Sequence, residues 1–251
     1  GVTGTHGKGT VSAMITHCLI TAGKDPTFLI GGVLNNHGTN ARAGAGGYAV
    51  AEVDESDGSH LNLEPAHVVV NNLEVDHLNY YDDLDDIIGH MADFIGRNAG
   101  LKTLALNWDD AGVRRLAARL GAAQGEYEIL TYGAASSGTG ALDYAARDVT
   151  DLGDRVRFQA FRGDEHLGEI TLPIPGNYNA DNAAGAMAVA MGALGIDFAT
   201  VQAALDDYRG LENRFTVRRA GGLTLVKDYI SHPTGMRRVL DSARKMEHAR
   251  I

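Results

Sequence analysis

The sequence predicts an α/β fold, in which a doubly wound, mostly parallel sheet carries a phosphate-binding loop and a small antiparallel subsheet. Two observations predict it. Strand-length apolar stretches alternate with stretches of helical periodicity, as in a parallel sheet covered by helices. The chain also opens on a glycine-rich stretch, residues 1–10 (GVTGTHGKGT), that runs into a helical pattern. Such a junction directs backbone N–H groups and the helix dipole at one anion.

The glycine-rich stretch carries Lys8, followed by Gly9 and Thr10. It departs from the general phosphate-loop pattern, which requires glycine at Val2 and a hydroxyl residue at Gly9. Lys8 would bring a positive charge to the β- and γ-phosphates, and the Thr10 hydroxyl is a candidate Mg²⁺ ligand. The alternative is an ordinary turn before a helix, with Thr10 as the helix N-cap.

The first half of the chain alternates helical and strand patterns. A one-sided apolar stripe from Val11 to Leu19 predicts a first helix that ends at Gly23. Residues 28–30 form a short apolar strand, and the polar, glycine-rich residues 31–47 are expected to be a loop outside the core. Further strands are predicted at 48–53, 67–73, 103–107 and 129–132, with helices at 84–98 and 110–120.

The pattern changes in the second half. Residues 155–162 and 165–172 alternate on either side of Gly163-Asp164, which predicts an antiparallel hairpin in a small sheet beside the main one. Helices follow at about 178–194 and 198–208, then a hairpin around Gly221-Gly222 and a last helix opened by Pro233. The chain lacks an initial Met and a strand before residue 1, so we expect a piece of a longer protein whose first strand is missing.

Composition excludes several classes of function. The net charge of −10 argues against a nucleic-acid-binding surface. No signal peptide or long apolar run occurs, so no membrane span is predicted. Cys18 is the only cysteine and lies on the apolar side of the first helix, which favours a buried small residue over a nucleophile and fits a reducing cytoplasm. The oligomeric state is not indicated.

Two residues follow predicted strands at the edge where parallel sheets bind ligands, namely Glu52 and His77. A carboxylate suits Mg²⁺, so Glu52 is a candidate ligand, with Glu55 as the alternative ligand and a helix cap as the alternative role. Imidazole is an unusual Mg²⁺ ligand, so the residues alone indicate a general base or a surface histidine for His77.

An ordered set of motifs resembles the ATP-dependent Mur ligases of peptidoglycan synthesis over essentially the whole chain. The closest wording is that of the type that adds L-alanine to UDP-N-acetylmuramate. The motifs are TGTHGK (3–8), GGVLNNHGTNARAG (31–44), AEVDESDGSHL (51–61), VNNLEVDHLNYY (70–81), PGNYNADNAAGA (175–186), Arg214-Phe215 and DYISHPTGMRRVL (228–240).

The resemblance implies the domain organisation and the reaction. Residues 1–211 would be the central ATP-binding domain, and 212–251 the truncated start of the C-terminal domain, a second α/β domain. The family uses ATP and Mg²⁺ to phosphorylate a carboxylate, and an amine then attacks the acyl phosphate, releasing ADP and phosphate. Its partners are a nucleotide sugar and an amino acid. We expect the fragment alone to lack full ligase activity.

The resemblance also implies site residues, motif by motif. The catalytic residues would be Lys8, His77 and Arg214, and the metal ligands Thr10, Glu52 and His77. ATP would contact Gly4, Thr5, His6, Gly7, Lys8, Gly9, Thr10, Asn179, Asn182, Arg214 and Asp228. The substrates would contact Asn40, Arg42, Ser56 and His232. Without the resemblance, Asn179 and Asn182 are helix caps and Arg214 is a solvated hairpin charge.

The chain departs from the family pattern at three positions. Tyr178 replaces a histidine, Lys227 an aspartate and Ser231 a histidine. No lysine occurs between Lys24 and Lys102, which agrees with the alanine-adding type because that type lacks the carbamylated lysine of other Mur ligases. Three alternatives stay open: a murein-peptide recycling ligase, a ligase similar to folylpolyglutamate synthetase, and a nucleotide-binding module without ligase activity.

Overall fold

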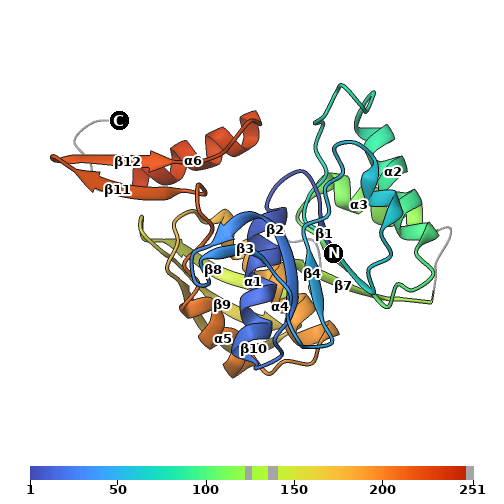
Figure 1. Ribbon diagram of the computed structural model, residues 1–251, viewed down its shortest axis with the longest axis horizontal. Coiled ribbons are helices and arrows are strands. Elements are labelled where there is room, and N and C mark those ends of the chain that lie inside the picture. The colour runs from blue at the N-terminus through green and yellow to red at the C-terminus, as the bar shows by residue number, and fades with distance from the viewer. Residues whose placement is uncertain (122–125, 135–140, 247–251) are drawn as a thin grey trace.

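The computed structural model describes residues 1–121, 126–134 and 141–246. Its centre is a seven-stranded sheet, whose place in the molecule is seen in Figure 1. The strand order is β1-β5-β6-β7-β8-β9-β10, parallel from β1 to β8 and antiparallel beyond. The strands are β1 (Val2–Thr3), β5 (His67–Val70), β6 (Thr103–Asn107), β7 (Glu128–Gly133), β8 (Tyr144–Asp151), β9 (Val156–Arg162) and β10 (Glu165–Leu172). The predicted α/β class is confirmed.

The predicted antiparallel hairpin forms at the expected residues, as β9 and β10. It extends the main sheet and does not form a separate sheet beside it, because β8 pairs in parallel with β7 and antiparallel with β9. Two residues at the start of the chain form a short strand, β1. Val2 and Thr3 pair with β5, and Val2 bridges Glu52 on its other side.

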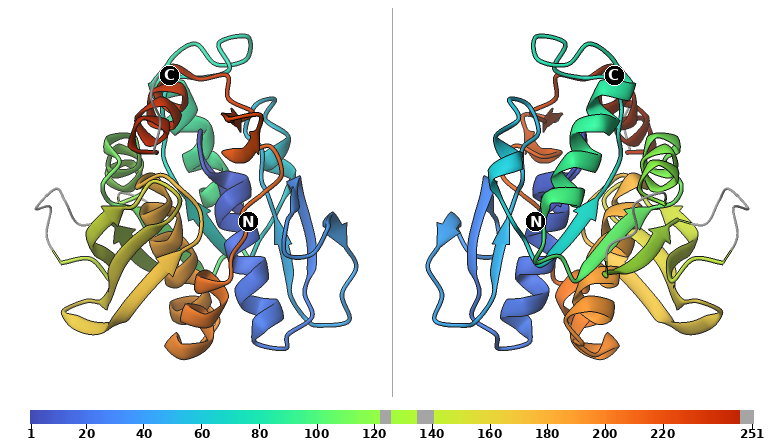
Figure 2. Two further views of the ribbon diagram at one scale, coloured as in Figure 1. Left: turned by 90° about the vertical axis from the view of Figure 1, so that its left-hand side faces the viewer. Right: turned by 90° about the vertical axis from the view of Figure 1, so that its right-hand side faces the viewer.

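Helices cover both faces of the main sheet (Figure 2). One face carries α1 (Lys8–Thr21), α4 (Tyr178–Met187), the π-helix η2 (Ala188–Ala193) and α5 (Phe198–Asp206), and the other carries α2 (Leu84–Arg97) and α3 (Ala111–Leu120). Successive residues of β5 alternate between two cores: Val69 packs on the α1 side, and Val68 and Val70 on the α2 side. The predicted doubly wound arrangement follows from this alternation.

A second sheet forms where a loop was predicted for residues 31–47. Its order is β3-β2-β4, with β2 (Thr27–Leu34), β3 (Thr39–Arg42) and β4 (Ala49–Ala51). The loop prediction was wrong because the glycines there allow close packing. A Cβ at Gly31 would lie only 2.8 Å from Glu52 Oε2.

Helix α1 is buried on every side over Val11–Leu19, although the sequence predicts a one-sided stripe. It contacts α4 and α5 as well as the β2 and β4 strands of the second sheet. The additional sheet therefore covers the side of α1 that would otherwise face solvent. Cys18 is fully buried as predicted, and burial raises the pKa of its thiol to about 12.

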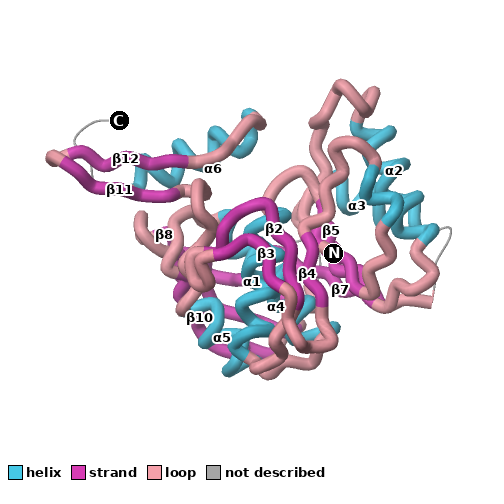
Figure 3. Tube along the Cα trace, in the orientation of Figure 1, coloured by secondary structure: helices cyan, strands magenta, loops and turns pink. Residues whose placement is uncertain are grey.

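The C-terminal residues form a separate two-stranded sheet and a helix, at one end of the main body (Figures 1 and 3). The elements are the hairpin β11 (Thr216–Ala220) and β12 (Leu223–Lys227), and α6 (Pro233–Lys245), close to the predicted positions. Several large apolar side chains are exposed there, namely Leu223, Leu225, Tyr229, Met236 and Leu240. Across the described ranges, no helix is long and apolar enough to cross a membrane.

Two of the aspartates that cap helices, Asp83 and Asp110, provide a matched test of how the loop after β5 is held. Asp83 caps α2 through Asp86 N at 2.9 Å. Asp110 caps α3 through Val113 N at 2.8 Å and also accepts from Leu73 N at 3.2 Å. We expect Asp83→Ala to lower the free energy of unfolding by about 1 kcal/mol. Asp110→Ala should cost about 2–4 kcal/mol, because the Leu73 amide then lacks its partner.

Urea unfolding followed by circular dichroism measures both changes. Equal losses in the two variants would contradict the additional role of Asp110.

Candidate active site

A cavity of about 680 Å³ opens between the loop after β1, the ends of β2 and β4, the start of α4 and the C-terminal segment. We call residues 4–10 the phosphate loop. The lining includes Thr5, His6, Gly7, Lys8, Gly9, Thr10, Asn40, Glu52, Asp54, His77, Tyr178, Asn179, Asn182, Arg214, Asp228, Ser231 and His232. Most of the predicted site residues are therefore brought to one cavity. The exceptions are Gly4, Arg42 and Ser56.

The phosphate loop is held by Asn71 and Asn72, which directly follow β5. Asn72 O accepts from Thr5 N at 3.0 Å, and Asn72 Oδ1 accepts from His6 N at 2.7 Å. Gly4 has φ of +118°, and a Cβ there would lie 2.7 Å from Asn72 O. Gly4 therefore contributes its backbone conformation, which allows the loop to approach Asn72 closely. Asn72 was not predicted as a site residue, although its position after a buried strand was a usable signal.

The start of α1 has the geometry of an anion site. Its N-cap is Gly7, with φ of +81° and no side-chain cap, so the first-turn N–H groups stay available to a ligand. A Cβ at Gly7 would lie 2.6 Å from Asn182 Oδ1, which makes this glycine necessary. Thr10 lies inside α1, so it is not the N-cap.

Lys8 points into a pair of carboxylates. Its Nζ lies 3.0 Å from Glu55 Oε2 and 3.5 Å from Asp54 Oδ1. Glu55 is buried, with 3% of its surface exposed. Burial raises the pKa of Glu55, and the Lys8 charge opposes this rise. Lys8 therefore stabilises a buried carboxylate as well as offering a cation to the cavity.

His77 joins the same carboxylates. Its Nε2 lies 4.0 Å from Glu55 Oε1 and 3.8 Å from Asp76 Oδ2. Ligand atoms of Asp54, Glu55 and His77 all lie within 4.8 Å of one another. This oxygen-rich group suits a hard cation such as Mg²⁺, so the donor set fits the metal that the sequence predicts.

Glu52 stands apart from that group. Its Oε2 accepts from Gly31 N at 2.6 Å, and a Cβ at Gly9 would lie 3.1 Å from the same oxygen. The carboxylate is thus fixed against the start of α1, one residue from Thr10. The geometry brings Glu55 to His77 and Glu52 to the phosphate loop, so both remain candidate Mg²⁺ ligands.

The start of α4 places its asparagines differently from helix caps. The N-cap is Asn177. Asn179 Nδ2 donates to Pro175 O at 2.7 Å, and Asn182 Nδ2 donates to Asn179 Oδ1 at 2.9 Å. The cap interpretation is therefore wrong for Asn179 and Asn182. Tyr178 packs against Gly176 at the cavity wall.

Arg214 and Asp228 meet at the entrance to the C-terminal segment. Arg214 donates to Tyr229 O, and its Nη1 lies 3.8 Å from Asp228 Oδ1. Asp228 Oδ2 accepts from Phe215 N at 2.8 Å, and burial raises the pKa of Asp228. Arg214 is thus a half-exposed charge that faces the cavity from the segment opposite the phosphate loop.

The four predicted substrate residues divide into two pairs. Asn40 and His232 line the cavity. Arg42 instead pairs with Asp25 Oδ1 at 2.8 Å, and Ser56 donates to Asp54 Oδ2 at 2.6 Å. Hence Ser56 positions a cavity carboxylate, and Arg42 lies outside the lining.

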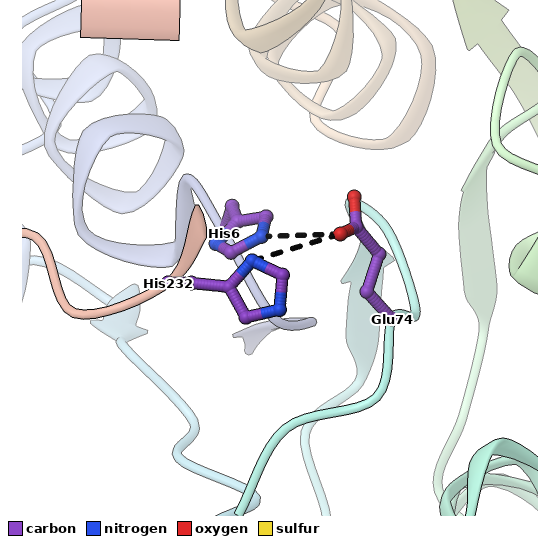
Figure 4. Close-up of side chains that lie close together, drawn as sticks. All are labelled: His6, Glu74 and His232. Carbon is purple, nitrogen blue, oxygen red and sulfur yellow. Dashed lines mark ion pairs between the residues drawn. The ribbon is translucent and has the colours of Figure 1, made fainter. Parts of the chain in front are cut away.

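A second cluster was not predicted as a unit. His6 Nε2 and His232 Nδ1 each lie 3.7 Å from Glu74 Oε2 (Figure 4). Burial lowers the pKa of His6, while the Glu74 charge opposes this shift. Glu74 belongs to an acidic run after a strand, but its link to His232 depends on a contact between segments distant in sequence.

Together these groups can support transfer of a phosphoryl group between two anions. Such a step needs cations and fixed N–H donors more than a nucleophile. Lys8 and Arg214 supply the cations from opposite walls, the start of α1 supplies the donors, and the carboxylates can hold a metal ion.

Comparison with known proteins identifies the family of the chain. Residues 2–190 match the Mur ligase middle domain. The chain is 38% identical over 247 residues to the UDP-N-acetylmuramate–L-alanine ligase of Desulforapulum autotrophicum, covering 97% of the chain and 52% of that protein. It is 40% identical over 247 residues to the enzyme of that name from Geotalea uraniireducens, covering 97% and 51%. The chain thus spans about half the length of these relatives.

Solved structures give the same result. The UDP-N-acetylmuramate–alanine ligase of Thermotoga maritima superposes with a TM-score of 0.79 at 26% identity, covering 97% of this chain and 53% of that one. A murein peptide ligase from Psychrobacter arcticus has a TM-score of 0.72 at 23% identity over 97% of this chain and 54% of its own, and it shows the fold alone. The chain belongs to the Mur ligase family, of which it contains the middle domain.

Proposed function

We propose that this chain is the ATP-binding part of a ligase that joins L-alanine to UDP-N-acetylmuramate, with ADP and phosphate as the other products. The observation that carries the proposal is the cavity in which Lys8, the start of α1 and Arg214 converge. Its support is the identity of 38–40% to relatives named for this reaction. The proposed location is the cytoplasm, which suits a chain with one buried free thiol.

The proposed organisation assigns 1–211 to the central domain and 212–251 to the start of the C-terminal domain. The main body contains the phosphate loop and the carboxylates, and the C-terminal segment contributes Arg214, Asp228 and His232. The substrates then meet between the two parts. The reaction then requires the main body and the C-terminal segment to hold the substrates in a fixed relative position.

In the proposed reaction, the phosphate loop and Lys8 bind the ATP phosphates. Thr10 and Glu52 would hold Mg²⁺ next to the loop, and His77 would hold a second ion beside the buried carboxylates. When bound, these ions neutralise charge on the phosphates. Arg214 adds positive charge on the transferred phosphoryl group. The remaining proposed ATP contacts are Asn179, Asn182 and Asp228, and Asn40 and His232 face the substrates.

Product analysis of the full-length protein that contains this chain tests the reaction. With ATP, Mg²⁺ and UDP-N-acetylmuramate, we expect L-alanine to give the amide product by mass spectrometry. Activity only with a murein tripeptide would indicate the recycling ligase, and activity with folate and glutamate would indicate the folate type. ATP binding without any product would indicate a nucleotide-binding module, in which Lys227 and Ser231 have altered the substrate side.

The charge of Lys8 should dominate nucleotide affinity. We expect Lys8→Ala to weaken ATP binding roughly 10- to 100-fold, since it removes one charge-assisted contact. Calorimetry measures the affinity, and circular dichroism checks the fold, because Glu55 loses its partner. The matched control is Lys24→Ala, an exposed lysine beyond the end of α1. An unchanged affinity in folded Lys8→Ala would contradict the phosphate role.

The two candidate Mg²⁺ carboxylates can be separated. We expect Glu52→Gln to raise the Mg²⁺ concentration that half-saturates ATP binding by about tenfold or more, because a neutral amide is a weaker ligand. Glu55→Gln should change it less, since Glu55 faces Lys8 and His77. A larger increase of this Mg²⁺ concentration in Glu55→Gln than in Glu52→Gln would identify Glu55 as the ligand.

A further inference from the structure

The cluster formed by His6, Glu74 and His232 unites three segments that are far apart in the chain (Figure 4). His6 belongs to the phosphate loop, Glu74 follows β5, and His232 is the N-cap of α6. One ligand atom from each lies within 4.8 Å of the others. The two histidine rings are tilted, with their centroids 4.7 Å apart, so both nitrogens face the single oxygen Glu74 Oε2.

The outer contacts of His232 place its lone pair on the nitrogen nearest Glu74. Its Nε2 lies 3.2 Å from the carbonyl oxygen of Val75, a contact that requires an N–H on Nε2. Its Nδ1 therefore carries the lone pair; this atom accepts from Thr234 N at 3.2 Å and lies 3.7 Å from Glu74 Oε2, so an ion bound there would replace the cap contact to Thr234. A ligating histidine that donates its other N–H to a carbonyl is the usual arrangement at protein metal sites.

Glu74 and His6 are also positioned to bind a metal ion. Glu74 Oε2 accepts from the Thr234 hydroxyl at 2.7 Å, which fixes the carboxylate. His6 Nε2 is buried, and among the described residues it has no hydrogen-bond partner. A buried polar nitrogen without a partner is costly, and a bound cation would satisfy it.

The spacing matches a tetrahedral metal. Ligand bonds of about 2.0–2.1 Å at tetrahedral angles place ligand atoms roughly 3.3–3.5 Å apart. The observed nitrogen-to-oxygen distances are both 3.7 Å, so only a small contraction is needed. Two imidazoles and one carboxylate favour Zn²⁺ and similar transition metals over Mg²⁺, which prefers oxygen.

We propose that His6, Glu74 and His232 form a Zn²⁺-binding site, separate from the carboxylate group around His77. Its open fourth position faces the cavity that His6 and His232 line. The ion links the phosphate loop to the first turn of α6, and so it ties the main body to the C-terminal segment.

Metal titration of the chelator-treated chain, without nucleotide, tests the site. We expect one Zn²⁺ per chain by calorimetry, one Co²⁺ with visible absorption bands of a four-coordinate site, and a melting temperature that rises with Zn²⁺. The variants His6→Ala, Glu74→Gln and His232→Ala should each weaken binding by more than 100-fold, because each removes a direct ligand. Thr234→Val should weaken it roughly 10- to 100-fold through the outer contact.

Two histidine controls make the test specific. His90→Ala removes a histidine whose Nε2 lies 3.6 Å from a carboxylate oxygen of Asp86 elsewhere on the surface, and it should leave Zn²⁺ affinity unchanged. His77→Ala removes the other metal-like group and should also leave it unchanged. Glu74→Gln keeps the side-chain shape, so it reports on the ligand even where a histidine variant fails to fold. Zn²⁺ binding that survives Glu74→Gln, or that is lost in His77→Ala, would overturn the proposal.

Discussion

The site depends on the attachment of the phosphate loop to the end of β5. The loop has few side chains with which to hold itself, so Asn71 and Asn72 provide the contacts: their Nδ2 atoms each donate to His6 O at 3.1 Å. Glycine is required at position 4 because a Cβ there would collide with Asn72. This attachment fixes the direction of α1, and with it the first-turn N–H groups that face the cavity.

Charge inside the cavity is balanced around Lys8. Its ammonium group is the closest cation to Glu55, which burial alone would push toward the neutral form. The same ammonium group is the proposed phosphate ligand. A nucleotide phosphate therefore competes with Glu55 for Lys8, and a metal ion near His77 would offset the charge that Glu55 then carries. If Lys8 binds the phosphate as proposed, nucleotide binding and metal binding are linked through this one lysine.

Much of the fold could be predicted because strand and helix periodicities are local. The ranges of β6, α2 and α3 follow directly from apolar spacing. The errors concern features set by tertiary contacts. Residues 31–47 were expected to be a loop outside the core because they are polar and rich in glycine, yet Gly31 is needed for the approach of Glu52. The burial of α1 on all sides depends on the second sheet. Because that sheet was not predicted, the full burial of α1 was not predicted either.

The sequence indicates which types of residue line the cavity, but not which side chains contact one another. A cation at position 8 and carboxylates after two strands follow from the sequence pattern, whereas the choice of partner follows from turn geometry. Glu52 and Glu55 are three residues apart, yet one faces the start of α1 and the other faces Lys8 and His77. The cluster around Glu74 could not be predicted, since His232 reaches it from the far end of the chain.

Two groups of potential metal ligands now lie at the same edge of the sheet, and their chemistry separates them. The group of Asp54, Glu55 and His77 offers mainly oxygen, while the group of His6, Glu74 and His232 offers mainly nitrogen. Mg²⁺ prefers oxygen ligands and Zn²⁺ binds imidazole nitrogen well, so the two ions are expected to prefer different groups. On the two proposals made above, this edge would hold a metal for phosphate chemistry beside a metal that joins the phosphate loop to α6.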